Sequence, residues 1–489
     1  MIMKTLCTFR RLLIFCLIIL INNQLSNAQT KAAQIEDLMS LYTEYGQFNG
    51  SLLVSEDGEV IYKNGFGKAN MEWDIPNTSN TKHRLGSITK QFTAMLILQL
   101  VEEGKLQLDV PISTYLLDYP KTSGDKITLH HLLTHTAGVP NYTSFPKFFE
   151  ETSRDPYIPN DFTSLFKDME LEFAPGERFA YSNSGYFLLG VIIEEVTGKS
   201  YEENLKEKIF QPLNMKDTGF DHHNTILKNR ASGYEKQGDS YSNAPYLDMS
   251  IPYSAGSLYS TVEDLYLWDR ALTANTLLSK KNTELLFASH IKSGSGTYGY
   301  GWGVNKMANG TSKDSLVVIG HGGGINGFNT LINRVPSSQD LIVLLNNTGG
   351  TNLGEMSRNI INILNEMPYD LPQKSLTNFL MEEISKKGLG AGVSAFEKQK
   401  GSKEYILREN EMNALAYQFL QSGKMNEAIA IFKLNVAEFP ESSNVYDSLG
   451  EAYMELGNKE LAILNYKKSI EMDPNNENGK EMLKKLLEN

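Results

Sequence analysis

Apolar runs predict β-strands in two groups that lie far apart along the chain. Residues 51–55 are largely apolar, residues 56–58 are a turn signal, and residues 59–62 continue the strand pattern. Three further strand-like runs come late, at residues 315–319, 328–335 and 341–345. Because helical segments separate the two groups, we expect one sheet closed by distant segments, in an α+β layered domain.

The longest apolar run after the first hairpin predicts a buried helix. Residues 92–101 are nearly all apolar, and Gly104 ends the run. A helix that is apolar on every side is surrounded by protein. We therefore expect Ser87 at the first turn of a central helix, where the helix dipole and free N–H groups favour developing negative charge.

The pattern changes around residues 368–372, after which the chain is helical and rich in Lys and Glu. Five positions recur there at one offset of 34 residues: Leu415, Gly423, Ala428, Phe432 and Pro440 match Leu449, Gly457, Ala462, Tyr466 and Pro474. This is the tetratricopeptide period, a pair of helices followed by proline. We expect repeats over residues 409–489, including a closing helix at 475–487.

Two clear repeats are fewer than the usual three. Residues 369–408 are therefore expected to form a helical linker or a degenerate repeat, or else the repeats pack on the main domain.

The first 28 residues have the pattern of a secretory signal peptide. Basic residues precede an unbroken apolar run at 12–21, and small residues at 26–28 favour cleavage before residue 29. The run is shorter than the ~20 residues that a bilayer span needs. We expect an exported protein, periplasmic or extracellular, whose main domain is residues 29–368. Retention of the segment as an anchor is the alternative.

Composition then limits the chemistry. Both cysteines, Cys7 and Cys16, lie in the signal segment, which excludes disulfides, thiol catalysis and Cys-ligated zinc in the mature chain. The net charge of −12 becomes −15 without the three cations of that segment. An acidic protein of this kind is a poor partner for nucleic acids and anionic membranes.

A Ser-x-x-Lys motif supplies a candidate nucleophile. The motif recurs, for example at Ser289, but only Ser87-Ile88-Thr89-Lys90 precedes a long buried helix. Residues three apart share a helix face, so Lys90 can reach the Ser87 hydroxyl. Desolvation there would disfavour the charged lysine and let it accept or relay a proton. A solvated lysine near a helix start is the alternative.

A Tyr-x-Asn motif supplies a phenol and an amide. Tyr181-Ser182-Asn183 lies between a turn at residues 175–177 and an apolar helix. A nearby lysine could lower the pKa of Tyr181 so that it serves as a base. Asn183 offers a donor and an acceptor to a substrate amide. A Tyr–Asn pair that only satisfies a turn is the alternative.

Glycines after a strand-like run form the third candidate element. His321-Gly322-Gly323-Gly324 follows an apolar run, and glycines let a backbone approach a bound substrate closely. His321, Gly323 and Gly324 are therefore candidate substrate-binding residues. Lys292-Ser293-Gly294 fits a Lys-Ser/Thr-Gly pattern more literally, but opens a loop for which we expect no strand. A Gly-rich turn that joins two strands is the alternative.

A histidine cluster resembles half of a zinc-binding helix. His131 and His135 are four residues apart, but residues 132–134 lack the Glu that metalloproteases use. No carboxylate ligand is evident nearby. We expect no metal and no organic cofactor.

Taken together, residues 37–363 resemble the serine β-lactamase and penicillin-binding-protein superfamily, and in particular its class C β-lactamase-like branch. The matching blocks are Leu85–Ala94, Leu132–Gly138, Tyr181–Tyr186, and His321–Gly323 with Gly327–Phe328. The resemblance implies a β-lactamase-like antiparallel sheet flanked by helices with a helical subdomain. An all-α tetratricopeptide module follows it.

The resemblance also implies roles for the candidate residues. Ser87 would be the acylated nucleophile, and Lys90 and Tyr181 would share the general base and acid work. Asn183 would hold the substrate amide or a relay hydrogen bond. The backbone N–H groups of Ser87 and Gly324 would form the oxyanion hole.

His321 stands where β-lactamases carry lysine. Histidine is mostly neutral near pH 7, which disfavours substrates with a terminal carboxylate and favours esters or peptides bearing D-residues. The sequence thus predicts an exported serine hydrolase of the esterase, D-aminopeptidase or DD-peptidase type. The alternatives are a β-lactamase, or a protein that binds a peptide or protein partner through its repeats and carries a vestigial hydrolase domain.

Overall fold

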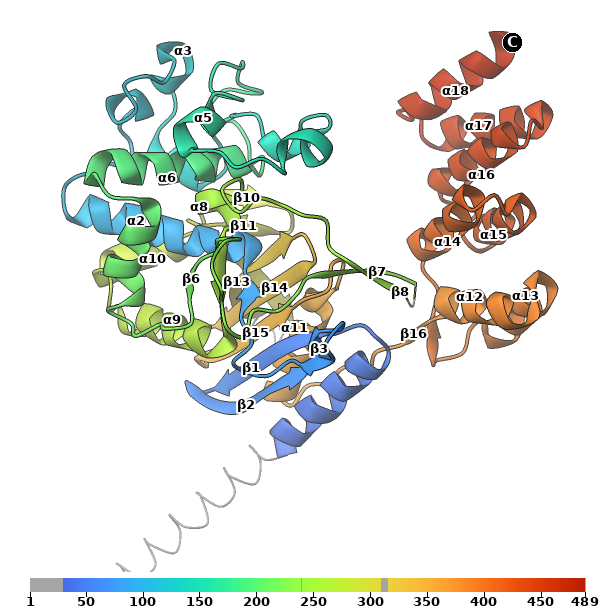
Figure 1. Ribbon diagram of the computed structural model, residues 1–489, viewed down its shortest axis with the longest axis horizontal. Coiled ribbons are helices and arrows are strands. Elements are labelled where there is room, and N and C mark those ends of the chain that lie inside the picture. The colour runs from blue at the N-terminus through green and yellow to red at the C-terminus, as the bar shows by residue number, and fades with distance from the viewer. Residues whose placement is uncertain (1–29, 239, 309–314, 489) are drawn as a thin grey trace, which may run out of the picture. The chain divides into compact units, whose positions relative to one another are not determined.

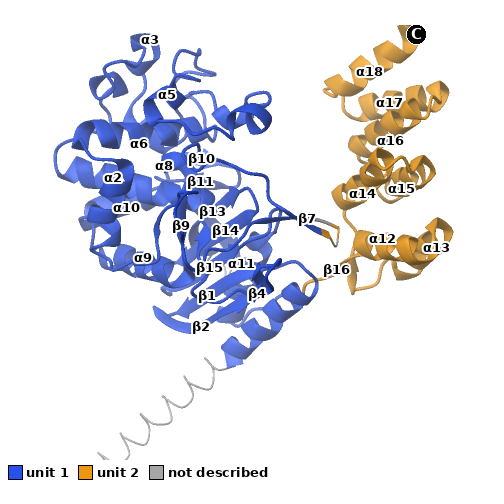
Figure 2. Ribbon diagram, in the orientation of Figure 1, with its two compact units in different colours: residues 1–236, 241–371 blue, residues 237–240, 372–489 orange. Residues whose placement is uncertain are grey.

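The computed structural model describes residues 30–238, 240–308 and 315–488, so the predicted signal segment lies outside the described residues. The chain divides into two compact units (Figure 2). The first comprises the described residues up to Lys236 together with Tyr241–Leu371. The second runs from Pro372 and includes Gln237–Ser240. Within the described ranges, no helix is long and apolar enough to cross a lipid bilayer.

An eight-stranded antiparallel sheet forms the centre of the first unit (Figure 1). Its strands, in spatial order, are β10 (Ile291–Ser293), β11 (Gly296–Tyr298), β12 (Gly303–Ala308), β13 (Ser315–Ile325), β14 (Phe328–Val335), β15 (Asp340–Asn346), β1 (Gly50–Glu56) and β2 (Glu59–Phe66). Strand β1 pairs with β15, with Gly50 opposite Asn346. The predicted α+β class, and the closure of one sheet by distant segments, are confirmed.

Helices cover both faces of this sheet, which explains why its central strands are apolar on both sides. Alternate residues of β15 enter different cores, because successive side chains of a strand point to opposite faces. Leu341 and Val343 pack in the core that contains helix α2 (Thr89–Glu102). Ile342 packs in a second core, with the helix over residues 30–44 and with α11 (Leu353–Leu364).

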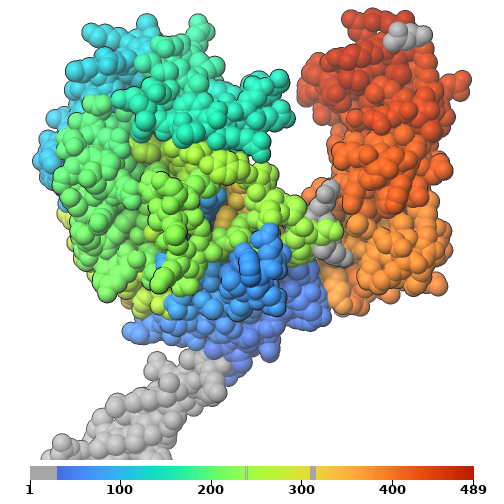
Figure 3. All heavy atoms as spheres, in the orientation of Figure 1, coloured from blue at the N-terminus to red at the C-terminus, as the bar shows by residue number. Residues whose placement is uncertain are grey.

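Shorter elements complete the first unit. The remaining helices are α3 (Lys121–Gly124), α4 (Leu129–Leu133), α5 (Pro159–Thr163), α6 (Asn183–Thr197), α7 (Tyr201–Leu205), α8 (Tyr253–Gly256), α9 (Val262–Ala274) and α10 (Lys280–Phe287). The small strands are β3 (Lys68–Asn70), β4 (Ile75–Pro76), β5 (His83–Arg84), β6 (Gly219–Phe220), β7 (Tyr234–Gln237), β8 (Ser240–Asn243) and β9 (Leu258–Ser260). Helices α3 and α5, cyan to green in Figures 1 and 3, lie at one end of this unit. This position agrees with the predicted helical subdomain.

Helix α2 confirms the prediction of a buried helix and extends it by three residues at its start. Eleven of its fourteen residues are buried. Ser87 lies in the 3₁₀ turn Gly86–Ile88 that leads into α2, and not in the first turn of the α-helix itself.

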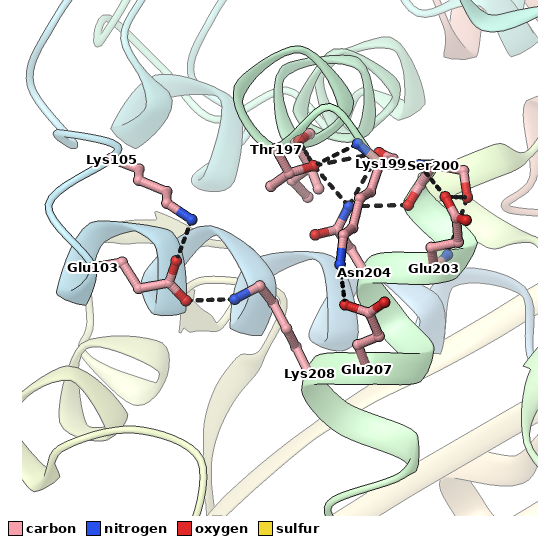
Figure 4. Close-up of polar contacts among 10 residues, drawn as sticks. Glu103, Lys105, Thr197, Lys199, Ser200, Glu203, Asn204, Glu207 and Lys208 are labelled. Atoms are coloured by element: carbon pink, nitrogen blue, oxygen red, sulfur yellow. Dashed lines mark hydrogen bonds and ion pairs between the residues drawn. The ribbon is translucent and has the colours of Figure 1, made fainter.

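Side-chain caps fix the turn between α6 and α7 (Figure 4). The Ser200 side chain accepts the backbone N–H of Glu203, and the Glu203 carboxylate accepts the backbone N–H of Ser200. This reciprocal arrangement satisfies two N–H groups that a helix start otherwise leaves unpaired. The Asn204 amide donates to Thr197 Oγ1 at 2.9 Å, which ties the new helix to the end of α6.

Over residues 372–488, the described part of the second unit after its short segment from the β7–β8 hairpin, the regular elements are helices apart from β16 (Lys374–Ser375) and β17 (Tyr405–Ile406). Its helices are α12 (Leu376–Lys387), α13 (Leu389–Gln399), α14 (Glu409–Gln421), α15 (Met425–Glu438), α16 (Ser443–Glu455), α17 (Lys459–Met472) and α18 (Glu477–Glu488). Helices α14–α15 and α16–α17 are the two predicted repeats, and α18 is the predicted closing helix. The small residue Gly450 lets α16 and α17 pack closely, since a Cβ at this position would lie 3.2 Å from the Tyr466 ring.

Candidate active site

The amine of Lys90 lies against the hydroxyl of Ser87. Lys90 Nζ is 3.0 Å from Ser87 Oγ, 2.8 Å from Asn183 Oδ1 and 2.9 Å from the carbonyl oxygen of Ala255. The amide and carbonyl oxygens can only accept hydrogen bonds, whereas the hydroxyl can donate or accept. A neutral amine would therefore direct its two N–H groups at the two obligate acceptors and its lone pair at the Ser87 hydroxyl.

Burial controls the protonation of Lys90. Its side chain is fully buried in the first turn of α2, where apolar residues exclude water. Desolvation lowers the pKa of Lys90 well below its ordinary value, because the charged form loses its hydration. Lys90 therefore releases its proton at a lower pH than a lysine in water.

The start of helix α6 places the Tyr-x-Asn motif at the same point. Ser182 is the N-cap, and its hydroxyl accepts the backbone N–H of Gly185. The amide of Asn183 contacts Lys90 through Oδ1 and donates through Nδ2 to Thr143 Oγ1 at 3.3 Å. A capped helix start thus fixes both ends of this amide.

Tyr181 stands beside Lys90 with its phenol protonated. Lys90 Nζ lies 4.8 Å from the centre of the Tyr181 ring, which stacks on the His135 ring at 4.2 Å. Although 36% of Tyr181 is exposed, desolvation raises its pKa above the ordinary value, and a hydrogen bond with Ser87 lowers it by less. The expected lowering of this pKa is therefore wrong in direction. Burial outweighs any effect of Lys90, whose own charge is disfavoured.

His321 belongs to a hydrogen-bonded chain that starts at the α6 cap. The Ser182 N–H donates to His135 Nδ1 at 3.0 Å, so His135 carries its proton on Nε2, which lies 3.3 Å from the Tyr298 hydroxyl. Tyr298 in turn lies 2.9 Å from His321 Nε2, and His321 Nδ1 lies 2.6 Å from the Gly322 carbonyl. Each ring has one donating and one accepting nitrogen, so the chain fits two neutral histidines.

The electrostatics around His321 agree with this protonation state. Desolvation, and to a lesser extent Lys90, lower the pKa of His321 to about 4. Desolvation also lowers the pKa of His135 well below its ordinary value. His321 is therefore neutral at pH 7 and supplies no cation for a substrate carboxylate.

The glycines after His321 let strand β13 approach the turn that carries Ser87. A Cβ on Gly323 would lie 1.9 Å from the Leu85 carbonyl oxygen, and a Cβ on Gly86 would lie 3.0 Å from the Gly324 nitrogen. Residues 321–324 continue β13 as far as Ile325, so the alternative of a Gly-rich turn is wrong. Gly324 and Ser87 line one pocket.

This pocket has a volume of about 350 Å³ and is mostly apolar. Ser87, Asn183 and Gly324 line it, and the His321 ring lies 6.3 Å from that of Tyr181. Its other lining residues include Tyr142, Phe148, Phe149, Glu235, Leu247, Ile251, Phe328 and Gly349. All seven predicted site residues thus lie close together, each in contact with another of them or joined to one by a single intervening residue.

Three participants have no clear signal in the sequence. The Ala255 carbonyl is a backbone group and leaves no trace in residue type. Tyr298 carries no motif of its own. His135 lies within the Leu132–Gly138 block that resembles the family, and that block was the available signal.

Two other motifs that the sequence offered as candidates, the Lys-Ser-Gly motif and the histidine cluster, have structural positions of their own. Lys292 and Ser293 end strand β10 in an edge hairpin, so the expectation of no strand there is wrong. The imidazole of His131 accepts the backbone N–H of Thr128 in the cap of α4, which accounts for this histidine structurally.

Comparison with known proteins identifies the family. The Beta-lactamase family model matches residues 32–364, and a Tetratricopeptide repeat model matches residues 443–476. The chain therefore belongs to the β-lactamase-like family of serine hydrolases and carries C-terminal tetratricopeptide repeats.

Individual relatives agree with this assignment. PbpX of Bacillus subtilis (strain 168), named as a penicillin-binding protein, is 34% identical over 348 residues, which cover 70% of this chain and 81% of PbpX. The structure of a penicillin binding protein from Bacillus halodurans matches with a TM-score of 0.60 and 29% identity, covering 67% of this chain and 98% of that one. A D-stereospecific amidohydrolase from Streptomyces sp. matches with a TM-score of 0.55 and 26% identity, covering 64% and 92%.

Proposed function

We propose that this protein is an exported hydrolase that cleaves an ester or amide through an acyl intermediate on Ser87. One observation carries the proposal: the buried Lys90 amine lies 3.0 Å from Ser87 Oγ, and its other two neighbours are obligate acceptors. This arrangement leaves a lone pair for the proton that the serine must lose when it attacks.

In the proposed first half-reaction, Ser87 Oγ forms a bond to the substrate carbonyl carbon while Lys90 takes the hydroxyl proton. The N–H groups of Ser87 and Gly324 stabilise the resulting oxyanion, each contributing about 3 kcal/mol. Tyr181, protonated and hydrogen-bonded to Ser87, gives a proton to the leaving group as its bond to carbon breaks, and Lys90 restores the phenol.

In the second half-reaction, water replaces the leaving group. Its oxygen adds to the acyl carbon while the amine and phenol pair takes one of its protons. The ester bond to Ser87 then breaks, and the same pair returns a proton to Ser87 Oγ, which restores the hydroxyl. The amide of Asn183 lines the pocket and holds Lys90, so it is suited to orient the substrate amide as well. Every step uses groups of the chain itself.

Two observations support a substrate that is an amide or ester and needs no carboxylate group for binding. His321 is neutral at pH 7, so the third element provides no fixed cation. One similar structure is named as a D-stereospecific amidohydrolase, which makes D-amino-acid amides the first substrates to test. The family match and PbpX favour a β-lactamase or a penicillin-binding activity as the second candidate, and a chromogenic cephalosporin tests it.

The ends of the chain support two further parts of the proposal. The pattern of residues 1–28 supports export with cleavage before Gln29. The tetratricopeptide repeats support recruitment of a peptide or protein partner, since such arrays present extended binding surfaces.

The decisive experiment is covalent labelling. A fluorophosphonate probe should react with wild-type protein at Ser87, as mapped by mass spectrometry, and Ser87→Ala should lose both labelling and hydrolysis of p-nitrophenyl acetate. Ser289→Ala is a matched control, because Ser289 opens another Ser-x-x-Lys sequence on the exposed surface. Labelling elsewhere, or unchanged turnover in Ser87→Ala, would reject the proposal.

A further inference from the structure

A carboxylate lies in the wall of the pocket that contains Ser87. Glu235 is the second residue of strand β7, and it lines this pocket together with Ser87, Asn183 and Gly324. Among the described residues that line the pocket, Glu235 alone is formally charged at neutral pH. The proposed acyl-transfer steps give this carboxylate no role.

The backbone around Glu235 is fixed on both sides. The Tyr234 N–H donates to the Asn347 carbonyl at 3.1 Å, and the Gly349 N–H donates back to the Tyr234 carbonyl at 2.8 Å. This isolated bridge joins β7 to the segment after β15, the last strand before the sheet closes on β1. Glu235 therefore extends from a segment that the main sheet holds in place.

The two carboxylate oxygens of Glu235 have different surroundings. Oε1 accepts the backbone N–H of Gly327 at 2.9 Å. Oε2 lies against Gly349, where a Cβ would come within 2.1 Å, so only glycine leaves room for the carboxylate at that position. Within the described parts of the chain, Glu235 forms no ion pair with any lysine, arginine or histidine, and it is only partly buried. The carboxylate is thus held in place but keeps its negative charge uncompensated.

The rest of the pocket has the character of a site for an apolar group that ends in a cation. More of the wall is apolar than polar, and its aromatic and aliphatic side chains include Tyr142, Phe148, Phe149, Leu247, Ile251 and Phe328. Apolar walls with one convergent charged group are typical of small-molecule sites, where the charge fixes orientation. A lone carboxylate in such a wall favours an ammonium group and repels a substrate carboxylate.

We propose that Glu235 selects substrates that carry a protonated amine, such as amides or esters of amino acids with a free amino group. This inference rests on the proposed function and names its substrate class. The ammonium group would bind Glu235 while the carbonyl carbon lies at Ser87 Oγ. Glu235 is accordingly a specificity residue and takes no part in the proton transfers.

Matched substrates with and without the charge test the proposal. The 6-aminohexanoyl and heptanoyl p-nitrophenyl esters differ only by an ammonium in place of a terminal methyl group. D-phenylalanine p-nitroanilide and its N-acetyl derivative form a second pair. The two pairs place the ammonium at different distances from the scissile carbonyl. For the pair that fits the span from Ser87 to Glu235, wild-type protein should prefer the cationic member in kcat/KM, and Glu235→Gln should reduce that preference by about 10- to 100-fold, the scale of a charge-assisted hydrogen bond.

The glutamine variant separates charge from structure. Gln keeps an oxygen that can accept the Gly327 N–H, so a residue that only anchors this turn would leave the ratio of kcat/KM values unchanged. Glu284→Gln is the matched control, because Glu284 is an exposed carboxylate on α10. It should retain the wild-type ratio. An equal ratio in wild type and Glu235→Gln for both pairs would overturn the proposal.

A binding measurement keeps the inference independent of the chemistry. Calorimetry should show that wild-type protein binds n-hexylamine more tightly than n-hexanol, and that Glu235→Gln removes the difference. Loss of this difference in the variant supports the site even if Ser87 proves not to be the nucleophile. Conversely, Ser87 labelling combined with equal affinities for the amine and the alcohol rejects the substrate class alone and leaves the acyl-serine proposal intact.

Discussion

At the scale of single residues, the central feature is a buried lysine whose neighbours are a hydroxyl, an amide and a carbonyl. None of these neighbours is anionic, so no counter-ion in contact with Lys90 stabilises its positive charge. Desolvation lowers its pKa well below the ordinary value. The same burial keeps the Tyr181 phenol protonated, so the amine is the better acceptor and the phenol the better donor.

Lys90→Arg tests this division of work. A guanidinium stays protonated at all relevant pH values, so we expect kcat/KM to fall by roughly 10²–10⁴-fold, the scale of lost general base catalysis. In wild type, kcat/KM should rise with pH as Lys90 loses its proton, and the midpoint should lie below the pKa of a lysine in water. Lys292→Arg, in the exposed edge hairpin, should behave as wild type. A Lys90→Arg variant with wild-type kcat/KM would show that another group takes the proton.

The site residues that could be predicted from the sequence were those with fixed spacing. Ser87 and Lys90 share a helix face because they lie three residues apart, and Tyr181 and Asn183 immediately precede and begin a helix. The Ala255 carbonyl and Glu235 could not be predicted, because only the folded chain brings them to Ser87. The pKa of Tyr181 was predicted in the wrong direction, because it depends on the water that surrounding residues displace.

At the scale of elements, apolar patterning was sufficient wherever a strand or helix is buried on every side. Strands β1 and β15 and helix α2 were predicted nearly to their ends for this reason. Strand β13 was predicted too short, because its apolar run ends at Ile319 and glycines follow soon after. Tertiary contact explains the difference: Gly323 is required by the approach of the Leu85 carbonyl and does not end the strand.

Strand β5 contains a buried histidine that makes stability depend on pH. His83 is 0% exposed, its Nδ1 donates to the Thr81 carbonyl at 3.1 Å, and no partner for its Nε2 exists among the described residues. Burial lowers its pKa from 6.5 to about 4. The unfolded chain therefore binds more protons between these values, and the stability that neutral His83 provides is lost as pH falls through this range.

His83→Leu should reduce this dependence. We expect the loss of unfolding free energy between pH 7 and pH 5 to be smaller in the variant by about 2 kcal/mol, the value for a shift of this size. The variant also leaves the Thr81 carbonyl without its donor, which lowers stability at both pH values and cancels in the difference. Denaturant titrations at the two pH values measure it. An equal difference in both proteins would mean that His83 titrates normally in the fold.

At the scale of the whole molecule, the two compact units have separate hydrophobic cores. The cores of the first unit draw on residues between Ile35 and Leu364, and the core of the second draws on residues from Leu376 onward. The groups around Ser87 all belong to the first unit. The chemistry is therefore expected to depend on the first unit alone.

Deletion of all residues after Leu371 tests this independence. Because the described cores share no residue, we expect the truncated protein to fold and to keep kcat/KM for p-nitrophenyl acetate within about twofold. Circular dichroism on heating checks the fold, and the ester assay checks the site. A truncated protein that folds but loses activity would show that the repeats contribute to catalysis.

The pairing of β1 with β15 determines when during synthesis this enzyme can complete its fold. Gly50 can pair only after Asn346 has been synthesised. Until most of the chain has left the ribosome, the sheet is therefore incomplete and one edge of β1 has no strand beside it. Premature stop codons between these two strands should consequently yield insoluble fragments and not smaller working enzymes.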